Sequence, residues 1–426
     1  MHKAKIIVFC IFLSWGLVFI AKFTSFPFSS DKAYSSEHNL RNYKYPRAPI
    51  MDRNGIVLAE GDGTNRRYPY GPITCHFLGF FHPKVGMSGI EGDYASKLVS
   101  NAQARTYYFV KNNSSKAPLK TTLDIRLQKI VYEAFGDREG GVVVLNARTG
   151  EKYVEVSKPT FDPNKKNYKE LKKREDAPLL NRATKGLYYP GSTWKTVSSI
   201  ILSKRQDKAI VCTGIYHIGN NTYKCMYKHG KVTLSSAYSQ SCNLYFLKRC
   251  LSEVSQTEFI RTSQLFMRKK MPDSLNSKDY AFAILGQGPI SVSPLEEALL
   301  AATISNEGRM PTPMSVIGEQ AESSSVLSKE AALSLKKLME GVVKNGTGRQ
   351  LSDFLKKGSI GVKTGTAERL KNGKKVNVAS MIGFAHRAKK DPVVFAVVID
   401  NAENYSSQVC SPIVRKILEY YFAGKL

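Results

Sequence analysis

The sequence predicts an α+β fold in which an antiparallel sheet is covered by helices. Strand-like apolar runs occur near residue 141 and again after residue 360, and mostly helical patterns lie between them. Strands at both ends of a segment, with helices in the middle, favour an antiparallel sheet. The chain has 426 residues, which is enough for one large domain and a smaller one.

The first elements of the large domain follow from local patterns. Residues 121–123 are strand-like and lead into an amphipathic helix over residues 124–135. Asp124 is the N-cap candidate of this helix, because its carboxylate can accept hydrogen bonds from free amides of the first turn. The apolar run at residues 141–145 predicts a buried strand, and residues 146–150 are typical of a hairpin turn.

Later elements are predicted from apolar periodicity in the same way. A helix should begin near Ser192, directly after Pro190-Gly191. Further helices are expected at residues 294–305, 329–344 and 411–422, and strands at residues 360–366, 378–385 and 393–399.

The N-terminus predicts an uncleaved signal-anchor. Basic residues, Lys3 and Lys5, precede an apolar run at residues 6–21, and no A-x-A-like cleavage site follows it. The run is shorter than the roughly 20 residues of a typical spanning helix, but Lys22 can extend towards the interface. Because basic residues stay inside, we expect residues 1–23 to be a cytoplasmic tip with a single transmembrane span, and the rest of the chain to lie outside the cytoplasm.

Composition narrows the possible partners. The net charge of +28 comes from lysines and arginines spread over the whole chain. Such a charge indicates either a solvated basic surface or attraction to an anionic phase, such as membrane lipid or an acidic wall polymer. Nucleic acid is not expected as a partner, because no recognised binding module accompanies the charge.

Three short segments carry most of the chemical information. In chain order they are Ser192-Thr193-Trp194-Lys195, Ser241-Cys242-Asn243 and Lys363-Thr364-Gly365-Thr366. A lysine three residues after a serine on a helix brings an amine close to a hydroxyl. A free serine hydroxyl is a poor nucleophile and needs such a base. Lys195 can serve if it is neutral, and both burial and a nearby Lys363 would lower its pKa.

These motifs resemble those of class B, monofunctional penicillin-binding proteins, which are peptidoglycan D,D-transpeptidases. The order S-x-x-K, S-x-N and K-T-G is the trio of serine β-lactamases and penicillin-binding proteins. The resemblance implies the penicillin-binding, serine-transpeptidase fold, with a linker and pedestal at residues 24–120 and a transpeptidase domain at residues 121–426. Other stretches that resemble the family are residues 47–55, 88–91, 121–128, 146–150, 161–164, 190–195, 285–288 and 292–295.

The resemblance also implies a role for each motif residue. Ser192 would be acylated by a stem peptide or a β-lactam, with Lys195 as its base. Ser241 would relay a proton to the departing amine, and Asn243 would hold the substrate amide. Lys363, Thr364, Gly365 and Thr366 would bind the substrate, with the cation and hydroxyls facing its carboxylate. The amides of Ser192 and Thr366 would form the oxyanion hole.

The expected partners are peptidoglycan stem peptides, β-lactams, the bacterial plasma membrane and a membrane glycan polymerase of the shape, elongation, division or sporulation type. No cofactor and no metal are expected. Residues 1–120 are too few for a glycosyltransferase domain.

Two other classes of protein use similar sequence features. A β-lactamase or a β-lactam sensor shares the acylation machinery. However, the E-x-x-L-N segment of class A lactamases is not found, and Ser241-Cys242-Asn243 stands where class D enzymes and related sensors carry S-x-V. A sensor would also need several spans, and the sequence has one apolar N-terminal run. A purely non-enzymatic scaffold is disfavoured because all the motif residues are present.

The cysteines leave two alternatives open. Of seven cysteines, Cys212 and Cys225 bracket a stretch rich in Gly, Asn and Tyr that predicts a hairpin or loop. In an oxidising compartment the pair could form a disulfide, and otherwise they would be small buried thiols. No Cys/His spacing in the sequence resembles a zinc site.

Overall fold

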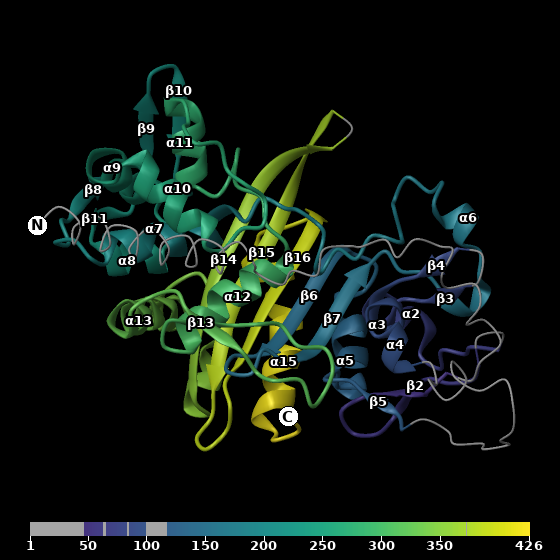
Figure 1. Ribbon diagram of the computed structural model, residues 1–426. Coiled ribbons are helices and arrows are strands. Elements are labelled where there is room, and N and C mark those ends of the chain that lie inside the picture. Colours follow the sequence, from purple (N-terminus) through teal and green to yellow (C-terminus); the bar gives the residue numbers. More distant parts are fainter. Residues whose placement is uncertain (1–46, 63–64, 83–84, 99–116, 372) are drawn as a thin grey trace, which may run out of the picture. The chain divides into compact units, whose positions relative to one another are not determined.

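An antiparallel sheet of five strands, in the order β14–β15–β16–β6–β7, organises the fold (Figure 1). Strand β6 pairs with β16, although some 250 residues separate them in the chain, so the two ends of the large domain join in one sheet. The predicted antiparallel sheet is therefore confirmed. The strands are β6 (Glu139–Asn146), β7 (Lys152–Lys158), β14 (Ser359–Lys371), β15 (Lys374–His386) and β16 (Val393–Ala402).

The computed structural model describes residues 47–62, 65–82, 85–98, 117–371 and 373–426, and these belong to one compact unit. The predicted signal-anchor lies outside the described residues. Within the described residues, none of the helices combines the length and the apolar character that crossing a membrane requires.

Helices cover both faces of the sheet. Val142, Val143, Val144 and Leu145 are all fully buried, and consecutive strand residues point to opposite faces, so neither face of β6 is open to solvent. Helix α12 packs against β15, β16 and β6, whereas α5 packs against β7 and α15. The helices around the sheet are α5 (Ile125–Phe135), α12 (Pro294–Ser305), α13 (Lys329–Asn345) and α15 (Ser411–Phe422).

Local side-chain bonds explain where these elements begin. Asp124 accepts hydrogen bonds from the amides of Arg126 and Leu127 at 3.0 and 3.3 Å, as its predicted N-cap role requires. Ser293 and Glu296 form a capping box at the start of α12. Between β6 and β7, Asn146 Oδ1 accepts from the amides of the next turn and sets the predicted hairpin.

The N-terminal region contains a small sheet and a buried cluster of ion pairs. The Glu91 carboxylate forms ion pairs with Arg47 at 2.7 Å and with Arg66 at 2.6 Å, and all three side chains are almost fully buried. The paired cations compensate the carboxylate, which would otherwise be costly to bury. The elements here are β1 (Ile50–Met51), β2 (Val57–Ala59), α2 (Gly71–Leu78), β3 (Phe81–His82), β4 (Gly86–Met87), α3 (Gly89–Asp93), α4 (Ala95–Leu98) and β5 (Leu119–Lys120).

A helical region is inserted between β7 and α12. Its β9–β10 hairpin confirms the hairpin predicted between Cys212 and Cys225. Its elements are η3 (Pro163–Lys165), α6 (Tyr168–Leu171), η4 (Gly191–Trp194), α7 (Lys195–Leu202), β8 (Ile210–Cys212), β9 (Ile215–Ile218), β10 (Asn221–Lys224), β11 (Gly230–Val232), α8 (Leu234–Ser239), α9 (Asn243–Glu253), α10 (Gln256–Gln264) and α11 (Ser277–Ile284). Between α12 and α15 lie β12 (Arg309–Pro311), β13 (Ser323–Ser325), η5 (Arg349–Lys356) and α14 (Ser406–Val409).

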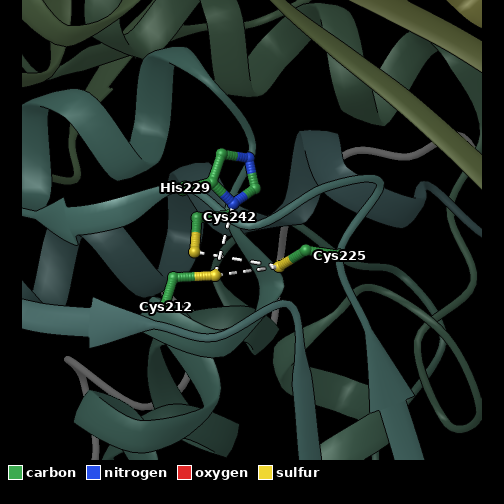
Figure 2. Close-up of side chains that lie close together, drawn as sticks. All are labelled: Cys212, Cys225, His229 and Cys242. Carbon is green, nitrogen blue, oxygen red and sulfur yellow. Dashed lines mark hydrogen bonds between the residues drawn. The ribbon is translucent and has the colours of Figure 1, made fainter.

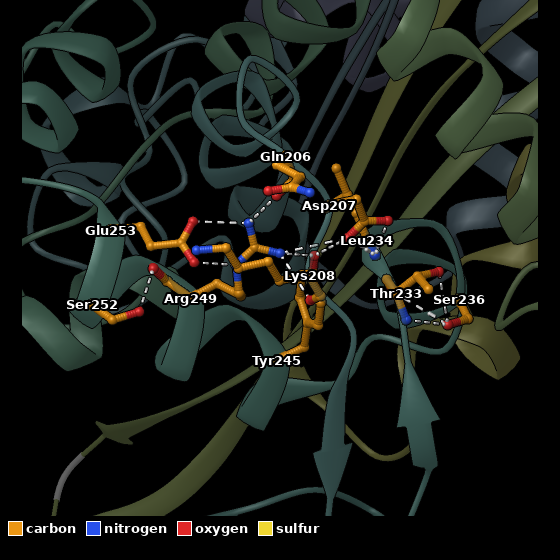
Figure 3. Close-up of polar contacts among 10 residues, drawn as sticks. All are labelled: Gln206, Asp207, Lys208, Thr233, Leu234, Ser236, Tyr245, Arg249, Ser252 and Glu253. Carbon is orange, nitrogen blue, oxygen red and sulfur yellow. Dashed lines mark hydrogen bonds and ion pairs between the residues drawn. The ribbon is translucent and has the colours of Figure 1, made fainter.

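Polar contacts fix α9 against the segment that follows α7 (Figure 3). Arg249 donates to the carbonyl of Gln206 at 2.8 Å and to the Tyr245 hydroxyl at 2.8 Å. The Tyr245 hydroxyl in turn donates to Asp207, which accepts from the amide of Leu234 at the start of α8. Because several charge-assisted bonds converge on Arg249, in the second half of α9, this helix has a rigid support.

Candidate active site

The first motif forms a tight turn rather than the start of an α-helix. Residues Gly191–Trp194 are a 3₁₀ turn, and the α-helix begins at Lys195, three residues later than predicted. In a 3₁₀ turn, residues three apart are eclipsed, so Ser192 and Lys195 lie on the same side. Lys195 Nζ is 3.0 Å from Ser192 Oγ. The pairing expected from the sequence is therefore present.

Lys195 is the centre of the site. Its side chain is fully buried, and its Nζ lies 2.8 Å from the Ser241 carbonyl, 3.2 Å from Ser241 Oγ and 2.6 Å from Asn243 Oδ1. Burial lowers the pKa of Lys195 to about 8, because the ammonium loses its hydration. A useful fraction of the amine is therefore neutral near neutral pH and can accept a proton.

The second motif lies where α9 begins. Ser241 has a φ of +58°, which an L-residue rarely adopts, and Cys242 is the N-cap of α9. This geometry places Ser241 Oγ between two amines, 3.2 Å from Lys195 Nζ and 3.1 Å from Lys363 Nζ. Asn243 Nδ2 donates to the carbonyl of Lys224 at 2.7 Å, so β10 helps to orient this amide.

The third motif lies on β14, as predicted. Lys363 is fully buried and donates to Ser241 Oγ and to the Thr364 carbonyl at 2.9 Å. Burial, with a contribution from Lys195, lowers the pKa of Lys363 well below its usual value. The Thr364 hydroxyl contacts the Thr347 hydroxyl at 2.5 Å, and that of Thr366 accepts from the amide of Ser406 at 3.4 Å.

Gly365 is where the first and third motifs touch. A Cβ at this position would lie 2.3 Å from the Pro190 carbonyl oxygen and 2.4 Å from Ser380 Oγ, so no side chain fits. Ser380 itself donates to the same Pro190 carbonyl at 2.9 Å. The backbone before Ser192 thus lies directly against β14. This close approach of two backbones explains why position 365 of the motif is a glycine.

The structure brings five predicted residues into one hydrogen-bonded chain. Ser192 contacts Lys195, which contacts Asn243 and Ser241, and Ser241 contacts Lys363. Thr364, Gly365 and Thr366 follow along the same strand. Such a chain can activate a hydroxyl, move a proton and present cations to an anion.

Comparison with known proteins identifies the family. A model of the penicillin binding protein transpeptidase domain matches residues 140–419, which is more than half of the chain. The chain belongs to this family. It is 24% identical to stage V sporulation protein D of Bacillus subtilis (strain 168), with 92% of this chain and 68% of the relative covered. It is also 24% identical to the peptidoglycan D,D-transpeptidase FtsI of Escherichia coli (strain K12), with 85% and 68% covered.

The chain thus spans about two thirds of the length of these two relatives. The fold is likewise that of solved penicillin-binding proteins. The ceftriaxone acyl-enzyme complex of penicillin-binding protein A from M. tuberculosis superposes with a TM-score of 0.79 at 22% identity, covering 89% of this chain and 99% of that one.

One buried carboxyl in this penicillin-binding protein was not anticipated from the sequence. Glu297 of α12 lies within hydrogen-bonding distance of the hydroxyl of Thr193, a residue that stands between Ser192 and Lys195 in the sequence. Thr193 Oγ1 is also 3.0 Å from the Pro190 carbonyl oxygen. Burial raises the pKa of Glu297 to about 8. A protonated Glu297 can donate to Thr193 while Thr193 donates to Pro190, which steadies the turn. The available signal was a pair of adjacent glutamates, Glu296 and Glu297, at the start of a largely apolar helix.

A second unanticipated cluster lies beside the S-x-N motif. Cys212, Cys225, His229 and Cys242 converge from separate segments (Figure 2). The Sγ atoms of Cys212 and Cys225 are 3.7 Å apart, and both thiols are free. Of the two alternatives left open by the sequence, the structure therefore has free thiols and no disulfide. The expectation that no metal site would be found must also be reconsidered, since these residues meet despite their spacing.

Proposed function

We propose that this penicillin-binding protein is a peptidoglycan D,D-transpeptidase that cross-links stem peptides through an acyl-enzyme on Ser192, and that β-lactams inhibit it by acylating the same residue. The observation that carries the proposal is the 3.0 Å contact between Ser192 Oγ and the buried amine of Lys195. A buried neutral amine beside a half-buried hydroxyl is an arrangement that creates a nucleophile.

During acylation, protons move through the hydrogen-bonded groups of Ser192, Lys195 and Ser241. Neutral Lys195 takes the proton of Ser192 Oγ as this oxygen attacks the carbonyl between two D-alanines. The amides of Ser192 and Thr366 stabilise the oxyanion. The backbone beside Ser192 lies close to that of Thr366, which supports a joint role for these two amides: a Cβ on Gly191 would lie 2.8 Å from the Thr366 carbonyl oxygen. Ser241 Oγ, between the two amines, passes a proton to the departing D-alanine. A stem-peptide amine then takes the acyl group.

The donor peptide binds as an added strand along β14. This strand is one of the two outermost strands of the sheet, with β15 on its other side. Main-chain groups of an edge strand can pair with an extended peptide. Lys363 and the hydroxyls of Thr364 and Thr366 receive the peptide's carboxylate. Burial and the neighbouring Lys195 depress the pKa of Lys363, and an incoming carboxylate would oppose both effects by favouring the charged ammonium.

We also propose that the protein acts at the bacterial plasma membrane with a membrane glycan polymerase of the shape, elongation, division or sporulation type. The support is the basic N-terminus and the apolar run at residues 6–21, which would leave the catalytic domain outside the cytoplasm. Co-purification of the full-length protein with a polymerase from its own membranes would test this partner.

A stable adduct with penicillin is expected. The Glu297 carboxyl contacts Thr193 rather than Ser192, so it is not placed to activate water for deacylation. The full-length protein should be labelled with a fluorescent penicillin, freed of excess drug and followed over time. Label should persist for hours. Rapid release with multiple turnovers would contradict the transpeptidase proposal and favour a β-lactamase.

Replacement of Lys363 by alanine should slow acylation by about 10- to 100-fold. A hydrogen bond to a charged group is worth about 1.5–3 kcal/mol, and Lys363 supplies one to the drug carboxylate. Rates should be measured by stopped-flow quenching with penicillin. Lys374→Ala, at the exposed first residue of β15, is the matched control and should acylate normally. An unchanged rate in Lys363→Ala would exclude the role in carboxylate binding.

A further inference from the structure

Three thiols and an imidazole surround one point beside the active site (Figure 2). Their ligand atoms all lie within 4.8 Å of one another. Cys212 Sγ is 3.7 Å from Cys225 Sγ and 3.3 Å from His229 Nδ1, and Cys225 Sγ is 3.8 Å from Cys242 Sγ. A hydrogen-bonded network of neutral thiols would be weak, so this convergence calls for another explanation.

The distances match the edges of a metal-centred tetrahedron. Zinc–sulfur bonds of about 2.3 Å at tetrahedral angles separate two sulfurs by roughly 3.8 Å. A zinc–nitrogen bond of about 2.0–2.1 Å places the nitrogen roughly 3.6 Å from each sulfur. The observed sulfur–sulfur separations of 3.7 and 3.8 Å fall on the first edge, and the 3.3 Å nitrogen contact is slightly shorter than the second.

The cluster is held by the fold. Cys212 ends β8, Cys225 follows β10, His229 precedes β11 and Cys242 caps α9. Cys212 and Cys242 are almost fully buried, and the amide of Cys225 is fixed to the Gly214 carbonyl at 2.9 Å. The His229 ring lies 4.3 Å from that of Tyr227, and its buried Nε2 has no hydrogen-bond partner among the described residues. The imidazole is therefore placed by the Tyr227 ring and by its Nδ1 contact with Cys212.

We propose that Cys212, Cys225, His229 and Cys242 bind one Zn²⁺ in a closed tetrahedral site. Soft thiolates with one imidazole select zinc over hard cations such as Mg²⁺ or Ca²⁺. Four protein ligands leave no open position, so the ion is structural and does not activate water. Ligation also keeps Cys212 and Cys225 from forming a disulfide.

The site acts on catalysis through position. Cys242 is the central residue of the S-x-N motif, so a metal bound to its sulfur restrains Ser241 and Asn243 on either side. Cys225 directly follows Lys224, whose carbonyl accepts the hydrogen bond from Asn243 Nδ2 at 2.7 Å. One ion thus joins the two segments that orient Asn243, and it holds Ser241 in its unusual φ of +58°. The four ligands are positioning residues.

Metal content tests the site directly. The full-length protein should be expressed with added zinc and purified without chelators. Elemental mass spectrometry should then find about one zinc per chain. Cys212→Ser, Cys225→Ser and His229→Gln should lose most of it. Cys250→Ser is the matched control, because Cys250 is also buried on α9 but lies outside the cluster, and it should keep its zinc.

A spectroscopic measurement keeps the test valid if a variant fails to fold. Wild-type protein refilled with Co²⁺ should show the intense visible bands of a tetrahedral ion and a thiolate charge-transfer band. Absence of zinc from the wild type together with no uptake of Zn²⁺ or Co²⁺ by the reduced protein would overturn the proposal. A Cys212–Cys225 disulfide in active, metal-free protein would also overturn it.

Rates of penicillin acylation test the positioning role of the zinc separately from zinc binding itself. Removing zinc with a chelator should slow penicillin acylation by about 10-fold, and returning Zn²⁺ should restore the rate. An unchanged rate would refute the positioning role. Ser192→Ala should retain its zinc although it cannot be acylated. The metal measurement therefore stands even if the proposed transpeptidase function fails.

Discussion

Replacing Ser192 by alanine should abolish covalent labelling by penicillin and leave the fold intact. The hydroxyl is the nucleophile of the proposed mechanism, and the other hydroxyl of the turn, on Thr193, is buried and bonded to Glu297 and the Pro190 carbonyl. We expect the acylation rate to fall by at least about 10⁴-fold. The stability should change little, because Ser192 is half-buried and its Oγ makes one hydrogen bond, to Lys195, worth about 1 kcal/mol.

The measurement combines fluorescent-penicillin labelling with intact-protein mass and circular dichroism. Ser203→Ala is the matched control, because Ser203 directly follows α7 and its Oγ bonds to the Ile200 carbonyl, outside the site. This variant should be labelled like the wild type. Peptide mapping of the labelled wild type should place the adduct on Ser192, and an adduct on any other residue would refute the assignment.

Lys195→Met should give the second largest loss. Methionine keeps much of the buried volume but cannot accept the Ser192 proton. Loss of a general base typically slows a reaction by about 10²- to 10⁴-fold, and we expect acylation by penicillin to fall within this range. The Ser192 hydroxyl remains, so a slow adduct should still form and map to Ser192. A rate within a factor of about two of the wild type would rule out Lys195 as the base.

The pH profile identifies the same group. The neutral amine is the active form, and burial lowers the pKa of Lys195 to about 8. Below pH 8 the neutral fraction rises by about tenfold per pH unit, so the acylation rate should rise with pH and level off near 8. The nearest ionisable groups are Lys363, which shares Ser241 Oγ, and the thiols of Cys225 and Cys242. Lys195→Met should lose the rising limb, whereas a flat wild-type profile between pH 6 and 8 would contradict the assignment.

Much of this site could be predicted because each motif is local and chemically distinctive. Ser192 and Lys195 lie three residues apart, and any helical turn brings them together. Lys363 lies in an alternating apolar run that predicts a strand. The sequence of the motifs does not predict, however, how the three segments are arranged around one another. Ser241 reaches both amines through a positive φ at a non-glycine residue, which no propensity predicts.

The zinc ligands could not be found by their spacing. The pattern is C-x12-C-x3-H-x12-C, without the closely spaced cysteine pairs that make zinc motifs recognisable. Each ligand lies at the end of a different element or directly beside it, so the site exists only after β8, β10, β11 and α9 have packed together. Glu297 escaped notice for a related reason. Its contact with Thr193 depends on how α12 crosses the sheet, and a helix pattern does not specify its neighbours.

The position of β14 at the edge of the sheet limits how this protein can escape its inhibitors. If a drug is recognised through the edge of β14, the hydrogen-bonding groups belong to the main chain, and no substitution other than to proline deletes them. The backbone behind this edge cannot easily shift, because Gly365 already touches Pro190 and Ser380. Resistance by mutation must therefore come from side chains around the edge or from slower acylation at Ser192. Both routes also disturb the stem peptide, so lower drug sensitivity carries a loss of cross-linking.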